Sequence, residues 1–186
     1  MKFIPRFGLG WLNGWFPLLI YVSIQAIVAF SCPKEVRARL IDRKEWTRQQ
    51  KVFTVIGKLC SLINIIILFI SPLTIGSAEF LIGIFFYFIG IITLSTAIIN
   101  FKNAPLTKPI ITGLYKISRN PQIVSIYIIF LGLILMIGSG ISLIILLGSI
   151  TGSHFSILGE EKRLKEQYGD SYLEFKKKVP RYFIFF

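Results

Sequence analysis

The sequence predicts an all-α, polytopic membrane protein with five transmembrane helices, the last two forming a C-terminal helical hairpin, followed by a short cytoplasmic amphipathic helix. Three observations favour this class. Hydrophobic residues make up 54% of the 186 residues and charged residues only 16%, whereas soluble domains carry about 25% charged residues. The mean hydropathy is +0.70, and the apolar residues form long runs. The charges cluster between these runs, so we expect a single integral membrane domain over residues 1–186.

Four apolar runs are present, and the last is too long for one span. The first three each contain about the 20 residues that a helix needs to cross a core of ~30 Å. The fourth is interrupted by Gly138-Ser139-Gly140, and a short glycine-rich turn is typical of an antiparallel helical hairpin. The predicted spans are residues 11–31, 52–75, 80–99, 123–137 and 141–158. The first three form the N-terminal part, residues 1–100, and the hairpin belongs to residues 101–186.

The three segments between and after the spans that are rich in basic residues all fall on one side of the membrane if the chain crosses it five times. The connections at 71–78 and 138–140 contain no basic residue. Because basic residues are enriched in cytoplasmic loops, we expect an N-terminus outside and a cytoplasmic C-terminus, in a plasma (inner) membrane. Lys2 and Arg6 weakly oppose this orientation. The net charge of +12 then reflects orientation and contact with anionic lipid, and we expect no nucleic-acid partner. The basic clusters are residues 34–51, 102–119 and 162–181.

Local signals mark where the hairpin helices begin and end. Asn120 followed by Pro121 is typical of a helix start, with proline at the first helical position. The second helix has no breaker before Gly169, so it is predicted to continue to Tyr168 with Gly169 as its cap. A helix over residues 141–168 is about 42 Å long at about 1.5 Å per residue. This length exceeds the hydrocarbon core, so its last turns are expected in the cytoplasm.

A short amphipathic helix is predicted to follow. Asp170 is expected to cap it, and Pro180 ends it because proline cannot continue a helix. Its lysines at 176–178 are expected at the lipid headgroups. Its apolar face comprises Tyr172, Phe175 and Val179, which lie at helical spacing.

Histidine and cysteine usage argues against a metal site or a disulfide framework. The chain has one histidine, His154, and two cysteines, Cys32 and Cys60, which we expect to be reduced. No Walker loop is present, and no G-x-G-x-x-G follows a strand. We therefore expect no metal ion.

Three residues of the hairpin have two open interpretations. His154 precedes Glu161 by two helical turns and shares its face, so it either lines a cavity or makes a structural hydrogen bond. Tyr127 and Ser125 either pack between helices or line a pocket.

Polar residues gather where the two hairpin helices open toward the cytoplasm. They are Arg119, Asn120, Glu160, Glu161, Tyr168, Tyr172 and Arg181. Polar groups near the hydrocarbon region are costly unless paired, so they are candidates for a functional site. The alternative is that the arginines bind lipid phosphates while the glutamates solvate a helix end. The spacing alone does not decide between these readings.

Five short motifs follow one another in the last third of the chain: G-L-Y at 113–115, R-N-P-Q-I-V-S at 119–125, E-E-K-R-L at 160–164, Y-G-D-S-Y at 168–172 and V-P-R at 179–181. In order and spacing they resemble the isoprenylcysteine carboxyl methyltransferase family and its phospholipid N-methyltransferase relatives. That group carries G-x-Y ahead of R-H-P-x-Y-x-G, then a helical hairpin, E-E-x-x-L, F-G-x-x-Y-x-x-Y and a V-P-R-like segment. The resemblance covers about 70 residues, and residues 1–100 match only as apolar spans.

The sequence departs from the family pattern at four positions. Asn120 stands where the family often has histidine, and it keeps the capacity to form hydrogen bonds. Ile123 replaces the usual tyrosine, Ser125 the usual glycine and Phe175 the second tyrosine after Gly169. The changes at 123 and 125 alter the expected pocket shape, and hence the expected substrate.

The resemblance implies methyl transfer from S-adenosylmethionine to a small amphipathic or lipid-like acceptor, a carboxylate, amine or thiol, at the cytoplasmic face. Such a displacement chiefly needs the nucleophile and methyl group aligned at about 3–3.5 Å. The implied cofactor-binding residues are Gly113, Tyr115, Arg119, Asn120, Pro121, Glu160, Glu161 and Tyr172. The implied catalytic residues are Arg119, Glu161 and Arg181.

Each part of the cofactor has an expected partner. Its carboxylate would bind an arginine or the N–H groups at the helix start at 120–121. Its amino group would bind one of the two acids at 160–161. Its adenine would lie against Tyr115 and Tyr172, and one of the motif arginines would orient the acceptor.

Two other functions stay open at this point. Membrane sterol and steroid reductases resemble the same C-terminal frame and use NADPH, so cofactor preference separates them from methyltransferases. A non-catalytic membrane protein with a decayed motif is the second alternative, which Ile123 and Ser125 favour.

Overall fold

The computed structural model describes residues 1–31, 33, 46–103 and 109–183, and within them the regular secondary structure is helical. The helices are α1 (Trp15–Phe30), α3 (Arg48–Ile70), α4 (Ala78–Lys102), the 3-10 helix η1 (Gly113–Lys116), α5 (Pro121–Ile137), α6 (Gly140–Tyr168) and α7 (Asp170–Lys178). The predicted all-α class is confirmed for these residues. Cys32, the basic residues at 34–45 and Lys108 lie outside them.

Each of the five predicted apolar runs overlaps one helix. Helices α3, α4 and α6 are long and apolar enough to cross a membrane, whereas α1 and α5 are apolar but shorter. Helix α3 starts earlier than its apolar run because Thr47 caps it in a reciprocal pair with Gln50. It ends at Ile70, before Pro72, because a residue that precedes proline disfavours the helical conformation.

The ends of α5, α6 and α7 agree with the prediction in all but two details. Gly138, with φ of 63°, ends α5, and Gly169 ends α6 after Tyr168. Asp170 was predicted to cap α7, but it is the first residue of that helix and Gly169 precedes it as the cap. Asn120 occupies the cap position of α5, yet its side chain makes no capping bond.

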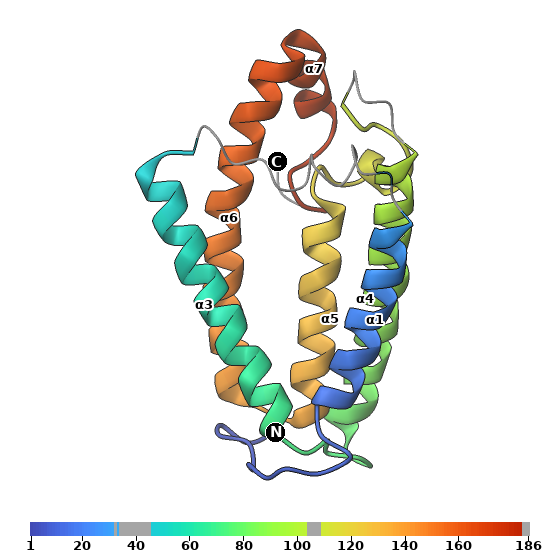
Figure 1. Ribbon diagram of the computed structural model, residues 1–186, viewed down its shortest axis with the longest axis vertical. Coiled ribbons are helices and arrows are strands. Elements are labelled where there is room, and N and C mark those ends of the chain that lie inside the picture. Colours follow the sequence, from blue (N-terminus) through green and yellow to red (C-terminus); the bar gives the residue numbers. More distant parts are fainter. Residues whose placement is uncertain (32, 34–45, 104–108, 184–186) are drawn as a thin grey trace.

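The helices pack as two groups (Figure 1). Helix α4 runs along α5, with α1 beside α4, and α3 runs along α6. Helices α5 and α6 are joined by the tight turn at Gly138 and Ser139 but contact each other little elsewhere. Three of the fully buried apolar residues, Ile129, Leu133 and Ile134, lie on α5, and Leu68 of α3 and Ala97 of α4 are buried to the same degree.

Glycines allow the closest helix contacts. Gly57 of α3 faces Gly152 of α6, and a Cβ atom added at Gly152 would lie 2.4 Å from the Cα of Gly57. Gly83 of α4 faces Gly132 of α5 in the same manner, with a Cβ atom at Gly132 only 2.7 Å from the carbonyl oxygen of Gly83. Small residues at such contacts are typical of helices that associate within membranes.

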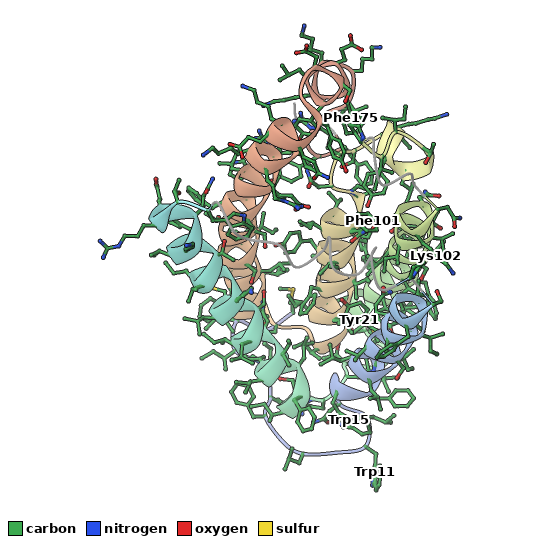
Figure 2. The ribbon with its side chains drawn as sticks, turned by 45° about the horizontal axis from the view of Figure 1, so that its top comes forward. Trp11, Trp15, Tyr21, Phe101, Lys102 and Phe175 are labelled. Atoms are coloured by element: carbon green, nitrogen blue, oxygen red, sulfur yellow. The ribbon has the colours of Figure 1, made fainter. Side chains whose placement is uncertain are left out.

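The N-terminal segment closes the end of the bundle at the hairpin turn. Lys2 donates its backbone N–H to the carbonyl of Gly138 at 2.9 Å and accepts a bond from the N–H of Gly140 at 2.8 Å. The amino group of Met1 pairs with Glu79. Trp11 and Trp15 lie at this end and Phe101 and Phe175 at the other (Figure 2). Trp11 is 87% exposed.

Candidate functional site

A cavity of about 250 Å³ lies at the end of the bundle opposite the hairpin turn. Its walls come from the end of α4, η1, the start of α5, the end of α6 and α7. Small-ligand pockets typically measure about 300–1,000 Å³, so the cavity is close to the lower end of that range. Six predicted site residues line it: Tyr115, Arg119, Asn120, Glu160, Glu161 and Tyr172. Gly113, Pro121 and Arg181 do not line it.

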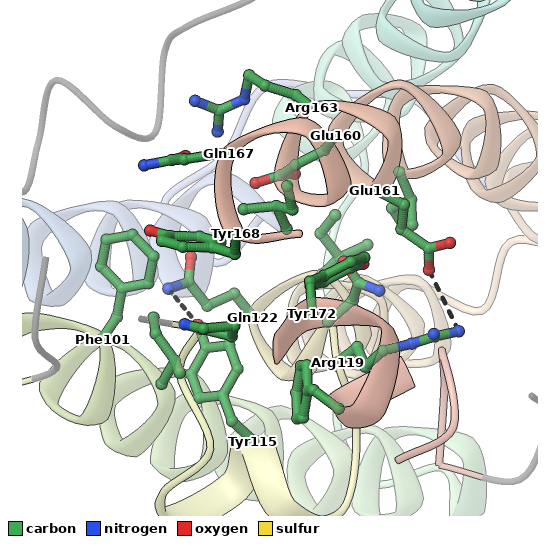
Figure 3. A pocket seen from close by; sticks show the side chains of 17 residues that line it. Phe101, Tyr115, Arg119, Gln122, Glu160, Glu161, Arg163, Gln167, Tyr168 and Tyr172 are labelled. Atoms are coloured by element: carbon green, nitrogen blue, oxygen red, sulfur yellow. Dashed lines mark hydrogen bonds and ion pairs between the residues drawn. The ribbon is translucent and has the colours of Figure 1, made fainter. Parts of the chain in front are cut away.

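The two ends of the cavity differ in chemistry (Figure 3). One end carries Phe101, Tyr115, Gln122 and Tyr168, and the other carries Arg119, Glu161 and Tyr172. The first end is mainly aromatic and also carries the amide of Gln167, and the second is ionic. Burial raises the pKa of the Tyr115 and Tyr172 hydroxyls, so both stay neutral phenols at physiological pH.

Glu161 is the centre of a cluster of ion pairs. Its carboxylate accepts two hydrogen bonds from Arg181, at 2.9 Å to Nε and 3.0 Å to Nη2. Nη2 of Arg119 lies 3.3 Å from Oε1 and Nζ of Lys176 lies 3.7 Å from Oε2. The side chains of Glu161 and Arg119 are 8% and 3% exposed. Three cations therefore surround one buried carboxylate, which stabilises its charged form.

The segment that follows α7, residues 179–182, is bound to the start of α5. The N–H of Arg119 donates to the carbonyl of Pro180 at 2.9 Å. The carbonyl of Arg181 accepts bonds from the Asn120 amide at 3.1 Å and from the Ser118 hydroxyl at 3.2 Å. The side chain of Arg181 thus acts on the site through Glu161, and its backbone fixes the loop that carries Arg119.

Two polar groups in the cavity wall remain uncommitted. Glu160 lines the cavity without a hydrogen bond or close ion pair to the described residues, and Arg163 acts on its carboxylate only through its charge. Nε of Arg119 is buried and lacks a partner there as well. A buried donor without a partner costs free energy unless a ligand or water satisfies it. An acceptor and a donor are therefore left for a ligand.

Gly113 and Pro121 do not line the cavity, but they set the backbone positions of η1 and α5, which do. Gly113 has φ of 56°, and a Cβ atom there would lie 2.0 Å from the amide nitrogen of Asn100. Only glycine fits this position, which brings η1 against α4. Pro121 is buried at the first position of α5 and has no N–H to donate.

Gln122 is a cavity residue that the sequence analysis did not select. Its Nε2 donates to the hydroxyl of Tyr115 at 3.0 Å, and both side chains line the cavity. Its position one residue after Pro121 could have indicated that it lines the cavity, because the first turn of α5 lies at this end of the bundle.

The two open interpretations of the hairpin residues are settled in favour of structural roles. Nδ1 of His154 lies 2.8 Å from the hydroxyl of Tyr182, so His154 fastens the C-terminal segment. Tyr127 donates to the carbonyl of Ser149 at 3.1 Å. Ser125 is fully buried and donates to the carbonyl of Pro121 at 2.8 Å. None of His154, Tyr127 and Ser125 lines the cavity.

The departures from the family pattern differ in their consequences. Ser125 is out of contact with the cavity, whereas Ile123 and Phe175 line it and make its wall more apolar than tyrosines would. Asn120 keeps a hydrogen-bonding role through its contact with Arg181. Within the described ranges, histidine, cysteine and acidic side chains form no group of three that could hold a metal ion.

The apolar helices are typical of an integral, multi-pass membrane protein, and the cavity lies at one end of these helices. A comparison with protein families matches residues 52–171 to the phospholipid methyltransferase family. The match covers more than half of the chain, so the protein belongs to this family of membrane methyltransferases, which generally use S-adenosylmethionine. Searches of curated proteins and of solved structures gave no match.

Proposed function

We propose that the protein transfers a methyl group from S-adenosylmethionine to a small amphipathic or lipid-like acceptor, in the manner of isoprenylcysteine carboxyl methyltransferases. The observation that carries this proposal is the cavity itself, which combines an aromatic end with an ionic end that holds one uncommitted carboxylate and one uncommitted guanidinium nitrogen. S-adenosylmethionine joins an aromatic base to an amino-acid group, and when bound it supplies an electrophilic methyl group on a sulfonium.

The uncommitted groups fit the amino-acid part of this cofactor. Glu160 is the better partner for its ammonium group, because the oxygens of Glu161 are already shared among three cations. Nε of Arg119 can donate to its carboxylate. The N–H of Asn120 is taken by the Ser118 hydroxyl at 3.1 Å, so the free donors at the helix start are those after Pro121.

The remaining walls fit an apolar acceptor. Ile123, Ile157 and Leu164 line the cavity from α5 and α6, and these helices contact each other little at this end. Tyr172 and Phe175 of α7 are buried and cover the cavity, which limits the access of water. A lipid-like acceptor would thus enter from the membrane, with its carboxylate, amine or thiol directed to the ionic part of the cavity.

The charges of the described residues support a cytoplasmic site. Lys102 at the end of α4, Lys162 and Lys165 near the end of α6, and the lysines at 176–178 of α7 all belong to the end that holds the cavity. We propose five membrane crossings in a plasma (inner) membrane, with the N-terminus outside and the C-terminus in the cytoplasm. The exposed lysines of α7 would then contact anionic lipid.

Calorimetric titration of the detergent-purified protein with S-adenosylhomocysteine, and with NADPH in parallel, tests the cofactor. We expect saturable binding of S-adenosylhomocysteine alone. Binding of NADPH alone would assign the chain to a reductase function, and binding of neither by a folded sample would leave a non-catalytic membrane protein. Transfer of a radiolabelled methyl group to fractionated membrane lipids then identifies the acceptor.

A further inference from the structure

The Gln122–Tyr115 pair leaves one donor and one acceptor side by side in the cavity. Nε2 of Gln122 donates to the hydroxyl oxygen of Tyr115 at 3.0 Å. The amide oxygen Oε1 of Gln122 accepts no hydrogen bond from the described residues, and the hydroxyl hydrogen of Tyr115 is given to none of them. Because the amide nitrogen is committed, the pair offers the amide oxygen as an acceptor and the phenol O–H as a donor.

This pattern complements one kind of base edge. Adenine presents a 6-amino donor beside the N1 acceptor, which is the same kind of donor–acceptor pair that a free glutamine side chain recognises at the 6-amino and N7 groups of adenine in DNA. Here the phenol of Tyr115 takes over the role of the amide nitrogen. Burial raises the pKa of Tyr115, so the hydroxyl keeps the proton that it needs for donation.

The surroundings of the pair suit a flat aromatic ring. Phe101 of α4 and Tyr168 of α6 lie at the same end of the cavity as Gln122 and Tyr115, away from the Arg119–Glu161 ion pair (Figure 3). Aromatic rings stack on or pack edge-to-face against one another. A ligand with a base and an amino-acid group would therefore place the base here and the charged group at the ionic end.

We infer that Gln122 and Tyr115 together recognise the 6-amino edge of adenine and so determine which purine the site accepts. This inference rests on the proposed function, because it assumes an adenosine-containing cofactor. Gln122 occupies a position that the family motif R-H-P-x-Y-x-G leaves variable, so the assignment concerns this chain's own residue. A purine whose edge lacks this donor and acceptor would leave the Tyr115 hydroxyl and the Gln122 amide oxygen without hydrogen bonds, which opposes its binding.

The test compares S-adenosylhomocysteine with S-inosylhomocysteine, in which an oxygen replaces the 6-amino group and the adjacent nitrogen carries a proton. Both are titrated calorimetrically into the full-length protein. The wild-type protein is expected to bind the inosine compound about tenfold more weakly or worse. In Gln122→Leu, affinity for S-adenosylhomocysteine should fall by about tenfold and the two compounds should bind nearly equally.

Gln167→Leu is the matched control. Gln167 is a second glutamine at this end of the cavity, but it is exposed and makes no bond to Tyr115, so its variant should keep the wild-type preference. Tyr115→Phe, which retains the ring, should lose part of the preference. Thermal unfolding of each variant shows whether it is folded.

Three outcomes would overturn the inference. They are equal binding of both compounds by the wild-type protein, an unchanged preference in folded Gln122→Leu, and loss of the preference in Gln167→Leu instead. Binding of neither compound by the folded wild-type protein would instead reject the proposed function on which the inference rests.

Discussion

Glu161 and Arg181 form a bidentate ion pair, with 2.9 Å between Oε1 and Nε and 3.0 Å between Oε2 and Nη2. The pair joins the last part of α6 to the segment that follows α7, and it also holds Glu161 against Arg119. Bidentate arginine–carboxylate pairs have a fixed geometry as well as a favourable energy. The pair therefore fixes the ionic end of the cavity.

Glu161→Gln should destabilise this end of the protein. The substitution leaves the buried Arg119 beside a neutral amide, and removal of one partner from a buried ion pair costs about 3 kcal/mol or more. We expect a lower melting temperature and faster hydrogen exchange in residues 170–182. Glu166→Gln is the control, because the Lys162–Glu166 pair is exposed and such pairs contribute little. Unchanged stability with weaker S-adenosylhomocysteine binding would show that Glu161 contacts the cofactor directly.

Glu160→Gln should weaken cofactor binding without a change in stability. Glu160 makes no hydrogen bond or close ion pair with the described residues and interacts with Arg163 only through its charge, so the fold should tolerate the change. The proposed ammonium contact would be lost, and hydrogen bonds to charged groups contribute about 1.5–3 kcal/mol. We expect the dissociation constant for S-adenosylhomocysteine, measured by calorimetry, to rise by about ten- to a hundredfold with an unchanged melting temperature. Wild-type affinity in this variant would remove Glu160 from the cofactor site.

Gly152→Ala should loosen the contact between α3 and α6. The added methyl group would lie 2.4 Å from the Cα of Gly57, and backbone atoms cannot move aside as side chains can. Overpacking of this kind typically costs about 1–3 kcal/mol, which thermal unfolding in detergent can measure. Gly8→Ala serves as the reference, since a Cβ atom there meets nothing within 4 Å. Equal stability of the two variants would contradict the close helix contact.

Cysteine labelling of intact cells tests the proposed orientation. In a background in which Cys32 and Cys60 are serine, Gly8→Cys should react with a membrane-impermeant maleimide, because it belongs to the outside end. Lys177→Cys on the exposed face of α7 should react only after the cells are opened. Reaction of Lys177→Cys in intact cells, or protection of Gly8→Cys, would contradict the orientation that the basic residues predict.

Most of the helices could be predicted from sequence because membrane spans are long and apolar and their ends carry local signals. Gly138 and Gly169 ended the hairpin helices where expected, since a positive φ is a local property of glycine. The N-terminal segment could not be predicted in this way. Its contacts at Gly138 and Gly140 join residues far apart in the chain and use backbone groups, which leave no side-chain pattern.

The position of the candidate site could be predicted from sequence, but the separate roles of its residues could not be assigned. Glu160 and Glu161 are adjacent, and neighbouring residues of a helix point about 100° apart, so only the rotation of α6 decides which acid meets Arg181. Gln122 was missed because the family motif leaves its position variable. Its partner Tyr115 comes from a separate element, η1, and the packing of η1 beside α5 is a tertiary contact.

The tight turn at Gly138 has a geometric consequence for the cavity. Helices α5 and α6 are held together at that turn, where Lys2 bonds to both sides of it, and α5 is 17 residues long. At about 1.5 Å per residue α5 measures about 25 Å, so a tilt of about 5° displaces its opposite end by about 2 Å. A small change in the angle between α5 and α6 at the turn therefore changes the width of the cavity at their far ends by about 2 Å, roughly the van der Waals radius of a methyl group.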